Sequence, residues 1–167
     1  APPLLLVGLG PEEEAGVVFL RLRKGARSHG LKAFSIAPFA SRGLRRVGDR
    51  GGVLLPAAPG TEPGVLDAVG TDDDLAPVRD ALADDGRGVI LVGERLAGVP
   101  GGYSAVLRLA GRTGARVAWV PRRAGERGAV ETGTLPTLLP GGRPVADAAA
   151  RVDLAGAWSV DSLPATP

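Results

Sequence analysis

Two glycine-rich turns are the parts of this sequence whose residue types and spacing could bind a phosphate-containing ligand. Gly8-Leu9-Gly10 stands between an apolar run and a helix-like stretch, the place that a dinucleotide fingerprint occupies. The fingerprint is incomplete, because Glu13 stands where its third glycine would be and Ala37 where an acid would bind the ribose. The glutamates Glu12–Glu14 would also repel a pyrophosphate. The residues therefore favour a tight structural turn, with dinucleotide binding as the alternative.

The second turn begins at Gly93-Glu94-Arg95 and follows another apolar run. Ligands of open α/β sheets bind at the carboxyl ends of strands, which is where this turn is expected. Glycine is frequent throughout the chain, at 26 of 167 residues, so a flexible loop is the simpler interpretation. No Gly-Lys-Ser/Thr follows either turn, which excludes a P-loop.

The composition excludes several kinds of reactive centre. The chain has no Cys, no Met and one His, His29, which is expected in a solvated turn, so thiolate metal sites, disulfides and multi-histidine centres are excluded. The acidic runs 12–14 and 72–74 stand at expected helix N-termini, where pairing with the helix dipole explains them better than a metal does. We therefore expect no catalytic residue, no metal ligand and no active centre in this chain.

The charge is balanced overall but unevenly distributed. The formal net charge is +2, from 20 basic and 18 acidic residues. Residues 21–50 contain nine basic residues and one acid, Asp49, whereas residues 61–85 contain eight acids and one base, Arg79. Aromatic residues that could stack bases do not interleave with the arginines, which argues against a nucleic-acid partner. We expect two solvated faces of opposite sign, which could pair across the fold.

Neither a membrane span nor a signal peptide is expected. No apolar run approaches the ~20 residues that cross a bilayer, and the apolar start lacks a basic region before it. Because the chain contains no Met at all, we expect an internal fragment of a larger subunit.

Alternating apolar runs and helix-like stretches predict the fold. Strands are expected at residues 4–7, 33–37, 53–55, 89–92 and 116–120. Helices are expected from Pro11 to a stop at Gly30, over 63–69, over 72–83 with Thr71 as the N-cap, and over 102–112 with a stop at Gly114. This alternation predicts an α/β class, a Rossmann-like parallel sheet with helices on both faces.

Beyond Arg122 the pattern becomes irregular, with frequent Gly and Pro. Short helices are expected near 129–132 and 145–150. We expect a single α/β domain over residues 1–167, with a regular core at about 1–122 and a C-terminal extension at 123–167 that wraps the sheet or docks on neighbours.

Several segments taken together resemble one family. Gly8–Glu14 is similar to the G-x-N-P-x-E turn of molybdopterin-dependent oxidoreductases, Ser35–Phe39 to their I-D-P-R strand end, and Leu55–Glu62 to their P-G-T-D segment. Trp119–Ala129 and Leu138–Val145 look like actinobacterial forms of one branch of that superfamily, the large iron–sulfur subunits of NADH-quinone oxidoreductase, or complex I. The resemblance extends over essentially the whole chain.

The resemblance implies a fold like that of the formate dehydrogenase and DMSO reductase type of molybdopterin oxidoreductase domain. It also implies a non-catalytic structural or assembly role in an oxidoreductase that carries electrons from NADH to quinone. The implied location is cytoplasmic, in a peripheral arm at the inner face of the plasma membrane. The implied partners are other domains of the parent subunit and neighbouring complex I subunits. No cofactor is expected in this segment, because the iron–sulfur clusters of the family lie elsewhere in the subunit.

In molybdenum enzymes the matching turns hold a pterin dinucleotide. The residues that would line the corresponding crevice here are Gly8, Gly10, Thr61, Glu62 and Gly93. The family's Asn is replaced by Gly10, its Asp by Ala37 and its Arg by Phe39. Each lost partner leaves a ligand group unpaired, at about 1–3 kcal/mol. We therefore expect a vestigial crevice; the alternatives are a pterin-dinucleotide or nucleotide-binding domain of a molybdopterin-type oxidoreductase, and a free-standing binding module.

Overall fold

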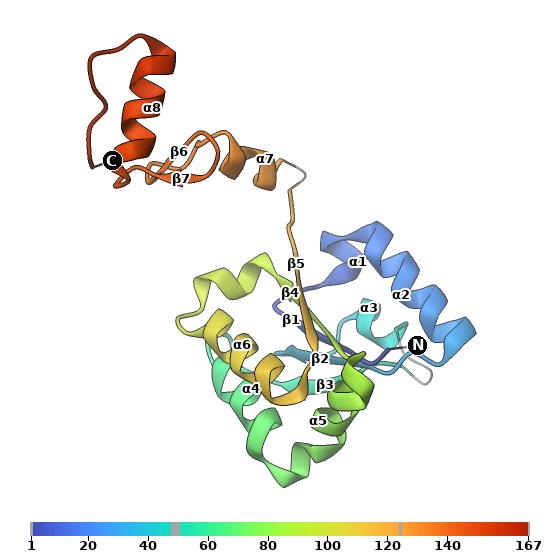
Figure 1. Ribbon diagram of the computed structural model, residues 1–167. Helices are drawn as coiled ribbons and strands as arrows, with labels where there is room; N and C mark the ends of the chain where they lie inside the picture. Colours follow the sequence, from blue (N-terminus) through green and yellow to red (C-terminus); the bar gives the residue numbers. More distant parts are fainter. Residues whose placement is uncertain (1, 48–50, 124, 167) are drawn as a thin grey trace. The chain divides into compact units, whose positions relative to one another are not determined.

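The computed structural model describes residues 2–47, 51–123 and 125–166 (Figure 1). Two residues of the sequence analysis lie outside the described residues. They are Asp49, the one acid of residues 21–50, and Ala124 of the segment Trp119–Ala129. The chain divides into two compact units, residues 1–122 and 123–167, and each has its own hydrophobic core. That residues 123–167 wrap the sheet stays a prediction.

The first unit is built on a five-stranded parallel sheet. Its strands, in the spatial order β3-β2-β1-β4-β5, are Val53–Pro56, Ala33–Ala37, Leu4–Val7, Val89–Gly93 and Arg116–Val120. The chain moves outwards from β1 in one direction through β2 and β3, and then returns to the other side of β1 for β4 and β5. The crossover connections therefore diverge between β1 and β4, which is where doubly wound sheets bind ligands.

One face of the sheet is covered by α1 (Pro11–Glu14), α2 (Gly16–His29) and α3 (Arg42–Arg45). Leu4 and Leu6 of β1 pack there with residues such as Phe19 of α2. The single helix predicted from Pro11 is in fact two, because Ala15 leaves helical geometry at φ −149° and ψ 66°. The predicted stop at Gly30 is confirmed, and this residue has a left-handed φ of 59°.

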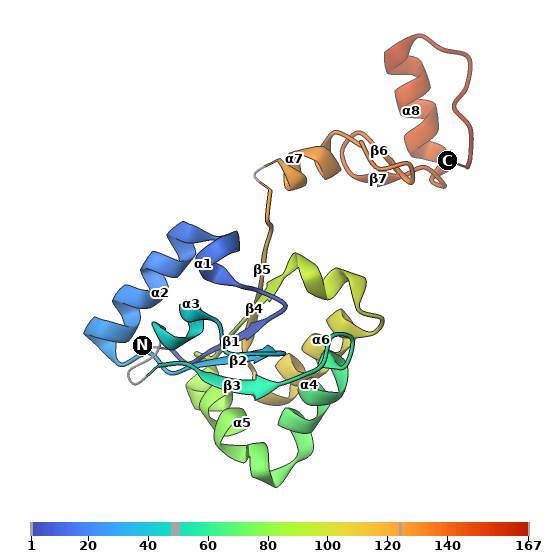
Figure 2. The same ribbon diagram turned by 180° about the vertical axis from the view of Figure 1, so that it is seen from behind.

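The opposite face is covered by α4 (Glu62–Thr71), α5 (Ala76–Ala83) and α6 (Gly102–Thr113). Figures 1 and 2 show helices on both faces, so the predicted fold class is confirmed. The predicted N-cap at Thr71 is wrong. Thr71 is the last residue of α4, and Asp72 caps the short 3₁₀ helix η1 (Asp73–Leu75), because its Oδ1 accepts a hydrogen bond from Asp74 N at 2.9 Å.

Two further 3₁₀ helices were not predicted. They are η2 (Asp84–Gly86), before β4, and η3 (Glu94–Gly98), which follows β4 directly. The second of these carries Leu96 into the core, at 1% exposure.

The second unit contains α7 (Glu126–Glu131), an antiparallel pair of short strands and α8 (Ala148–Trp158). The pair joins β6 (Leu138–Leu139) to β7 (Arg143–Pro144). The predicted helix at 145–150 is too short and begins too early. α8 starts after Asp147, whose Oδ1 accepts from Ala149 N at 3.0 Å, and it then buries Leu154.

The two charged stretches lie on opposite faces of the sheet. The basic residues belong mainly to α2 and α3, and the acids to α4, α5 and their 3₁₀ neighbours. Ion pairs of the acidic stretch include Asp67–Arg108 and Asp84–Arg87. Among the described residues, no helix has both the length and the apolar character that crossing a membrane requires.

Candidate functional site

A crevice of about 600 Å³ opens at the carboxyl edge of the sheet, around the point where the crossovers diverge. Residues from the segments after all five strands line it, together with the last residues of β2 itself. They are Gly8, Leu9, Gly10, Glu13 and Glu14 after β1; Ser35, Ile36 and Ala37 in β2 and Pro38, Phe39 and Ser41 after it; Pro59, Gly60 and Glu62 after β3; Arg95, Leu96 and Val99 after β4; and Arg122 after β5.

Gly8, which lines the crevice, and Gly93, which is buried behind it, allow a close backbone approach. Gly8 has a left-handed φ of 59°, and a Cβ there would lie 2.9 Å from Leu96 N. A Cβ on Gly93 would collide with the carbonyl oxygen of Gly8. These two glycines therefore allow β1, β4 and η3 to pack together. The packing at Gly8 agrees with the tight structural turn predicted there, whereas the flexible loop predicted after Gly93 is the 3₁₀ helix η3.

Glu14 and Arg95 form an ion pair across the crevice. Arg95 Nη2 lies 2.9 Å from Glu14 Oε1, and Arg95 Nε donates to the carbonyl oxygen of Gly8 at 3.3 Å. Glu14 Oε1 also accepts a hydrogen bond from Gly10 N at 3.2 Å, at the start of α1. The Glu14 side chain is only 8% exposed, whereas that of Arg95 is 58% exposed. The carboxylate is therefore a fixed part of the crevice wall.

Two carboxylate oxygens of the crevice are buried without a hydrogen-bond partner within the described part of the chain. They are Glu14 Oε2 and Glu62 Oε2. Glu62 is the first residue of α4, where the helix dipole favours a negative charge. Each of these oxygens exposes less than 1 Å² to solvent, and burying an acceptor without a donor costs about 1–3 kcal/mol.

The mouth of the crevice carries an exposed aromatic ring. Phe39 follows β2 and is 69% exposed. It stands where the resembling family has an arginine, so an apolar surface replaces a phosphate-binding cation at this position.

Only part of the predicted site comes together. Gly8, Gly10 and Glu62 line the crevice. Gly93 is buried behind Gly8, and Thr61 is exposed with its hydroxyl donating to the carbonyl oxygen of Ala58 at 2.7 Å. The sequence interpretation did not assign Glu14, Arg95 or Arg122 to a site. A signal for Arg95 was present in the sequence, because Arg95 belongs to the glycine-rich turn Gly93-Glu94-Arg95 and that turn was expected at the carboxyl end of a strand.

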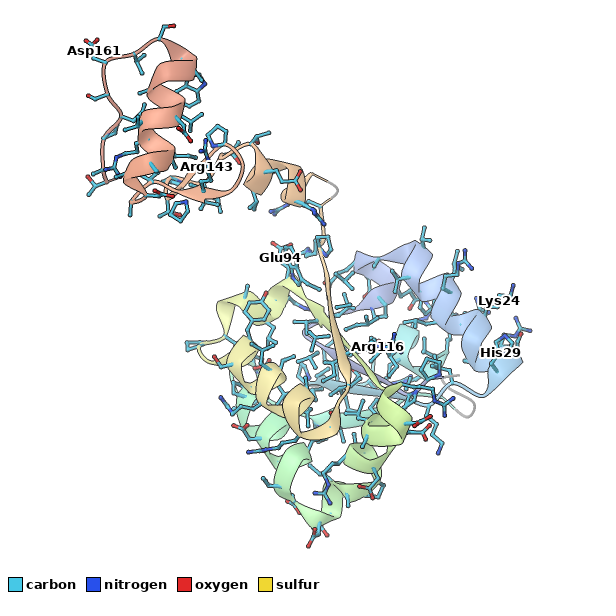
Figure 3. The ribbon with its side chains drawn as sticks, viewed as in Figure 1. Lys24, His29, Glu94, Arg116, Arg143 and Asp161 are labelled. Atoms are coloured by element: carbon cyan, nitrogen blue, oxygen red, sulfur yellow. The ribbon has the colours of Figure 1, made fainter. Side chains whose placement is uncertain are left out.

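His29 lies away from the crevice. It is the last residue of α2 and exposed, so its predicted place in a turn is wrong by one position. Figure 3 shows Lys24 and His29 towards one end of α2, far from Glu94 at the end of β4. Over the described ranges, no three His, Cys, Asp or Glu side chains are grouped as a metal ion would require.

An ion pair with two hydrogen bonds lies outside the crevice and joins α4 to α6. Arg108 Nε donates to Asp67 Oδ1 at 3.0 Å, and Arg108 Nη2 donates to Asp67 Oδ2 at 2.7 Å. This hydrogen bonding lowers the pKa of Asp67 below its ordinary value of 3.8 and raises the pKa of Arg108. The pair holds in register two helices that cover the same face of the sheet.

Comparison with known proteins gives relatives over nearly the whole chain. The chain is 57% identical over 165 residues to the G subunits of NADH-quinone oxidoreductase from Mycobacterium bovis and Mycobacterium tuberculosis. It is 54% identical over 168 aligned residues to the protein of the same name from Streptomyces coelicolor.

These alignments cover 98–99% of the chain but only 20% of each relative, so the chain spans about a fifth of the length of the curated relatives it matches. No protein-family model matches the chain. The chain is therefore similar, over 98–99% of its length and 54–57% of aligned positions, to one segment of the G subunit of NADH-quinone oxidoreductase.

Proposed function

We propose that this chain is a structural and assembly domain of the large iron–sulfur subunit in a respiratory NADH-quinone oxidoreductase and performs no catalytic step itself. The observation that carries the proposal is the 57% identity to such a subunit over 99% of the chain. In this proposal the whole complex passes electrons from NADH to quinone, through iron–sulfur clusters held elsewhere in the subunit. The chain then stands in the peripheral arm at the cytoplasmic face of the plasma membrane, in contact with other domains of the subunit and with neighbouring subunits.

The chemistry of the crevice supports a role other than phosphate binding. Glu13 and Glu14 stand beside Gly10, where the family's turn would approach a phosphate, and the Oε2 of Glu13 is 2.9 Å from the position of a Cβ on Gly10. Arg95, the nearest cation, is already paired with Glu14. An anionic ligand would meet carboxylates first, which is unfavourable. A vestigial crevice fits these contacts better than a working nucleotide site.

The edge of the sheet supports an assembly role. β5 pairs only with β4 within the described sheet, so its other edge leaves backbone groups available for a further strand. Val117 and Trp119 of β5 are 41% and 49% exposed. They lie on the face of the sheet that α6 covers, because they pair with Ile90 and Val92, which are buried against that face. Leu107 of α6 is 65% exposed. An apolar edge of this kind suits an extended segment of a partner protein that adds to the sheet.

The proposal predicts that the 167-residue chain, purified alone, does not oxidise NADH with ferricyanide or a soluble quinone as the acceptor. The intact oxidoreductase serves as the positive control in the same assay. Sustained turnover by the metal-free chain would falsify the proposal.

A nucleotide or pterin-dinucleotide site is the second candidate, because the crevice has a suitable size and stands at the divergence point of the sheet. Thermal unfolding with a guanine nucleotide separates the two candidates. A ligand at a hundred times its Kd stabilises its protein by about 2.7 kcal/mol. A saturable rise in Tm supports the second candidate, and an unchanged Tm at millimolar nucleotide supports the assembly domain.

A further inference from the structure

The face of the sheet that carries α2 is open over β4 and β5. Val89 and Leu91 of β4 pair with Leu4 and Leu6 of β1, so their side chains lie on the same face as α2. Leu4 and Leu6 are buried there, whereas Val89 and Leu91 pack against the margin of that core and are only half-buried. On β5 the neighbour of Leu91 is Ala118, which is exposed. The apolar core of this face therefore ends at an open flank.

The order of the elements explains the opening. α1 and α2 connect β1 to β2, and α3 connects β2 to β3, so these helices cover the part of the face over β1, β2 and β3. The helices that connect β3 to β4 and β4 to β5 pack on the opposite face. Figures 1 and 2 show α1, α2 and α3 on one side of β5 and α6 on the other. Among residues 2–47 and 51–122, no helix is left to cover β4 and β5 on the side of α2.

The open part of the sheet has the size and character of a surface for one helix. Helices cover both faces of nearly all parallel sheets, because a bare face leaves apolar side chains in water. The side chains on the open part are Val89 and Leu91 from β4 and Arg116, Ala118 and Val120 from β5, and we call it the β4–β5 face. Two neighbouring strands occupy about 10 Å across a sheet, which is also about the diameter of a helix.

The charges beside the β4–β5 face indicate the sign of the partner. α2, β4 and β5 contain no acidic residue. β5 contributes Arg116, which is exposed and lies two residues before Ala118 on the same face. The neighbouring α2 contributes the basic residues Arg21, Arg23, Lys24 and Arg27. An approaching segment with acidic side chains is attracted by these groups, whereas a basic one is repelled.

We infer that the β4–β5 face is the docking site of an acidic amphipathic helix from a partner protein. The apolar stripe of that helix covers Leu91, Ala118 and Val120, and its acidic side chains meet Arg116 and the basic residues of α2. This inference rests on the proposed assembly role, for which it names a second surface and the chemistry of the segment that binds there.

Cross-linking from Ala118 identifies the segment that occupies the β4–β5 face. A small photoreactive amino acid with a diazirine group replaces Ala118 in the intact oxidoreductase, and mass spectrometry identifies the cross-linked peptide. We expect a segment of another protein, with apolar residues at helical spacing and a net negative charge. The control position is Val17, which is 76% exposed on α2, and it is expected not to give this product.

Charge reversal tests the electrostatic part of the contact. Arg116→Glu in the intact oxidoreductase brings an acid towards the acidic helix, and we expect the amount of assembled complex to fall by about fivefold or more. Arg42→Glu is the matched control, because it makes the same change at an exposed arginine of α3, which packs beside β3, and it is expected to assemble normally. Both arginines are exposed, so the Tm of the chain alone should stay unchanged in both variants, which shows that they fold.

Several results would overturn the inference. They are a cross-link from Ala118 to the polypeptide that carries it, to a second copy of that polypeptide or to lipid, a cross-linked segment without acidic residues, and the absence of a cross-link. Normal assembly of Arg116→Glu would overturn it as well. If Trp119→Ser lowers assembly and Arg116→Glu does not, the assembly role stands without this surface. If both variants assemble normally, the assembly role itself is contradicted.

Discussion

The guanidinium of Arg95 lies 2.9 Å from the carboxylate of Glu14 and so ties the segment after β4 to the first helix after β1. Both side chains line the crevice and come from segments that follow β1 and β4, the two strands between which the crossovers diverge. A carboxylate and its paired guanidinium thus line the crevice beside the glycine turn after β1. The crevice stands where doubly wound sheets bind ligands, but its carboxylates do not suit a phosphate-containing ligand.

The Arg95–Glu14 pair should contribute measurably to stability. We expect Arg95→Ala to lower the free energy of unfolding by about 1–3 kcal/mol, because it leaves a buried carboxylate with one donor fewer. Glu14→Gln combined with Arg95→Ala should cost less than the sum of the single changes, with a coupling of about 0.5–3 kcal/mol. Urea unfolding of the four proteins measures both quantities.

The pair between Arg46 and Glu12 provides the control for that cycle. Its atoms are 3.1 Å apart, but its side chains are 43% and 26% exposed, so its carboxylate is far less buried than that of Glu14. Exposed pairs contribute about 0–1 kcal/mol. Equal coupling energies for the two pairs would show that the burial of Glu14 has no energetic consequence.

The approach of Gly93 to Gly8 predicts a strong effect from a single methyl group. Gly93→Ala places a Cβ against the carbonyl oxygen of Gly8, which is backbone and cannot move aside easily. We expect a loss of about 1–3 kcal/mol in the free energy of unfolding, as for other overpacked sites. Gly98→Ala is the matched control, because a Cβ there meets nothing within 4 Å. Similar midpoints of thermal unfolding for the two variants would rule out this account of Gly93.

The Asp67–Arg108 pair predicts a specific dependence on pH. The pKa of Asp67 in the folded chain lies below 3.8, chiefly through its hydrogen bond from Arg108, so the pair stabilises the fold above that pH. The contribution falls away as pH drops through the lowered pKa, because the carboxylate becomes protonated. We expect Asp67→Asn to lower Tm at neutral pH, and we expect its difference from the unchanged chain to shrink as the pH falls below 3.8. A difference in Tm that persists undiminished at the acidic end would contradict the assignment.

The strands were predictable because their residues carry the information locally. Leu4–Val7 and Ala33–Ala37 are apolar runs of the length of a buried parallel strand, and both were predicted at the correct bounds. The stops at Gly30 and Gly114 are also local, since both residues adopt a left-handed φ that other residues avoid. The class of the fold follows from these elements and their alternation.

The parts that could not be predicted depend on contacts distant in the sequence or on weak local signals. Ala148–Trp158 contains several small alanines, so its helical periodicity is faint, and its burial depends on Leu139 and Val145 of the same unit. Thr71 and Asp72 are both good capping residues, and only the course of the chain after α4 decides between them.

The crevice shows the same limit. Its glycines could be recognised from the sequence, but the pairing of Glu14 with Arg95 could not, because it requires β1 and β4 to be neighbours. The unpaired oxygen of Glu62 is likewise a property of the packed structure. What the sequence did indicate was the loss of the family's polar contacts at Ala37 and Phe39.

The central claim is that this segment serves assembly and not the reaction, and Trp119 allows the most direct test. Trp119→Ser in the intact oxidoreductase removes an exposed ring from the sheet edge, and Val17→Ser removes an apolar side chain that is 76% exposed on α2. The measurement is the amount of assembled complex together with NADH–quinone turnover per assembled complex. We predict that Trp119→Ser lowers assembly by about fivefold or more, as expected for an aromatic anchor of an interface. Turnover per complex should stay unchanged, and Val17→Ser should affect neither quantity. Normal assembly with a reduced turnover per complex would contradict the account.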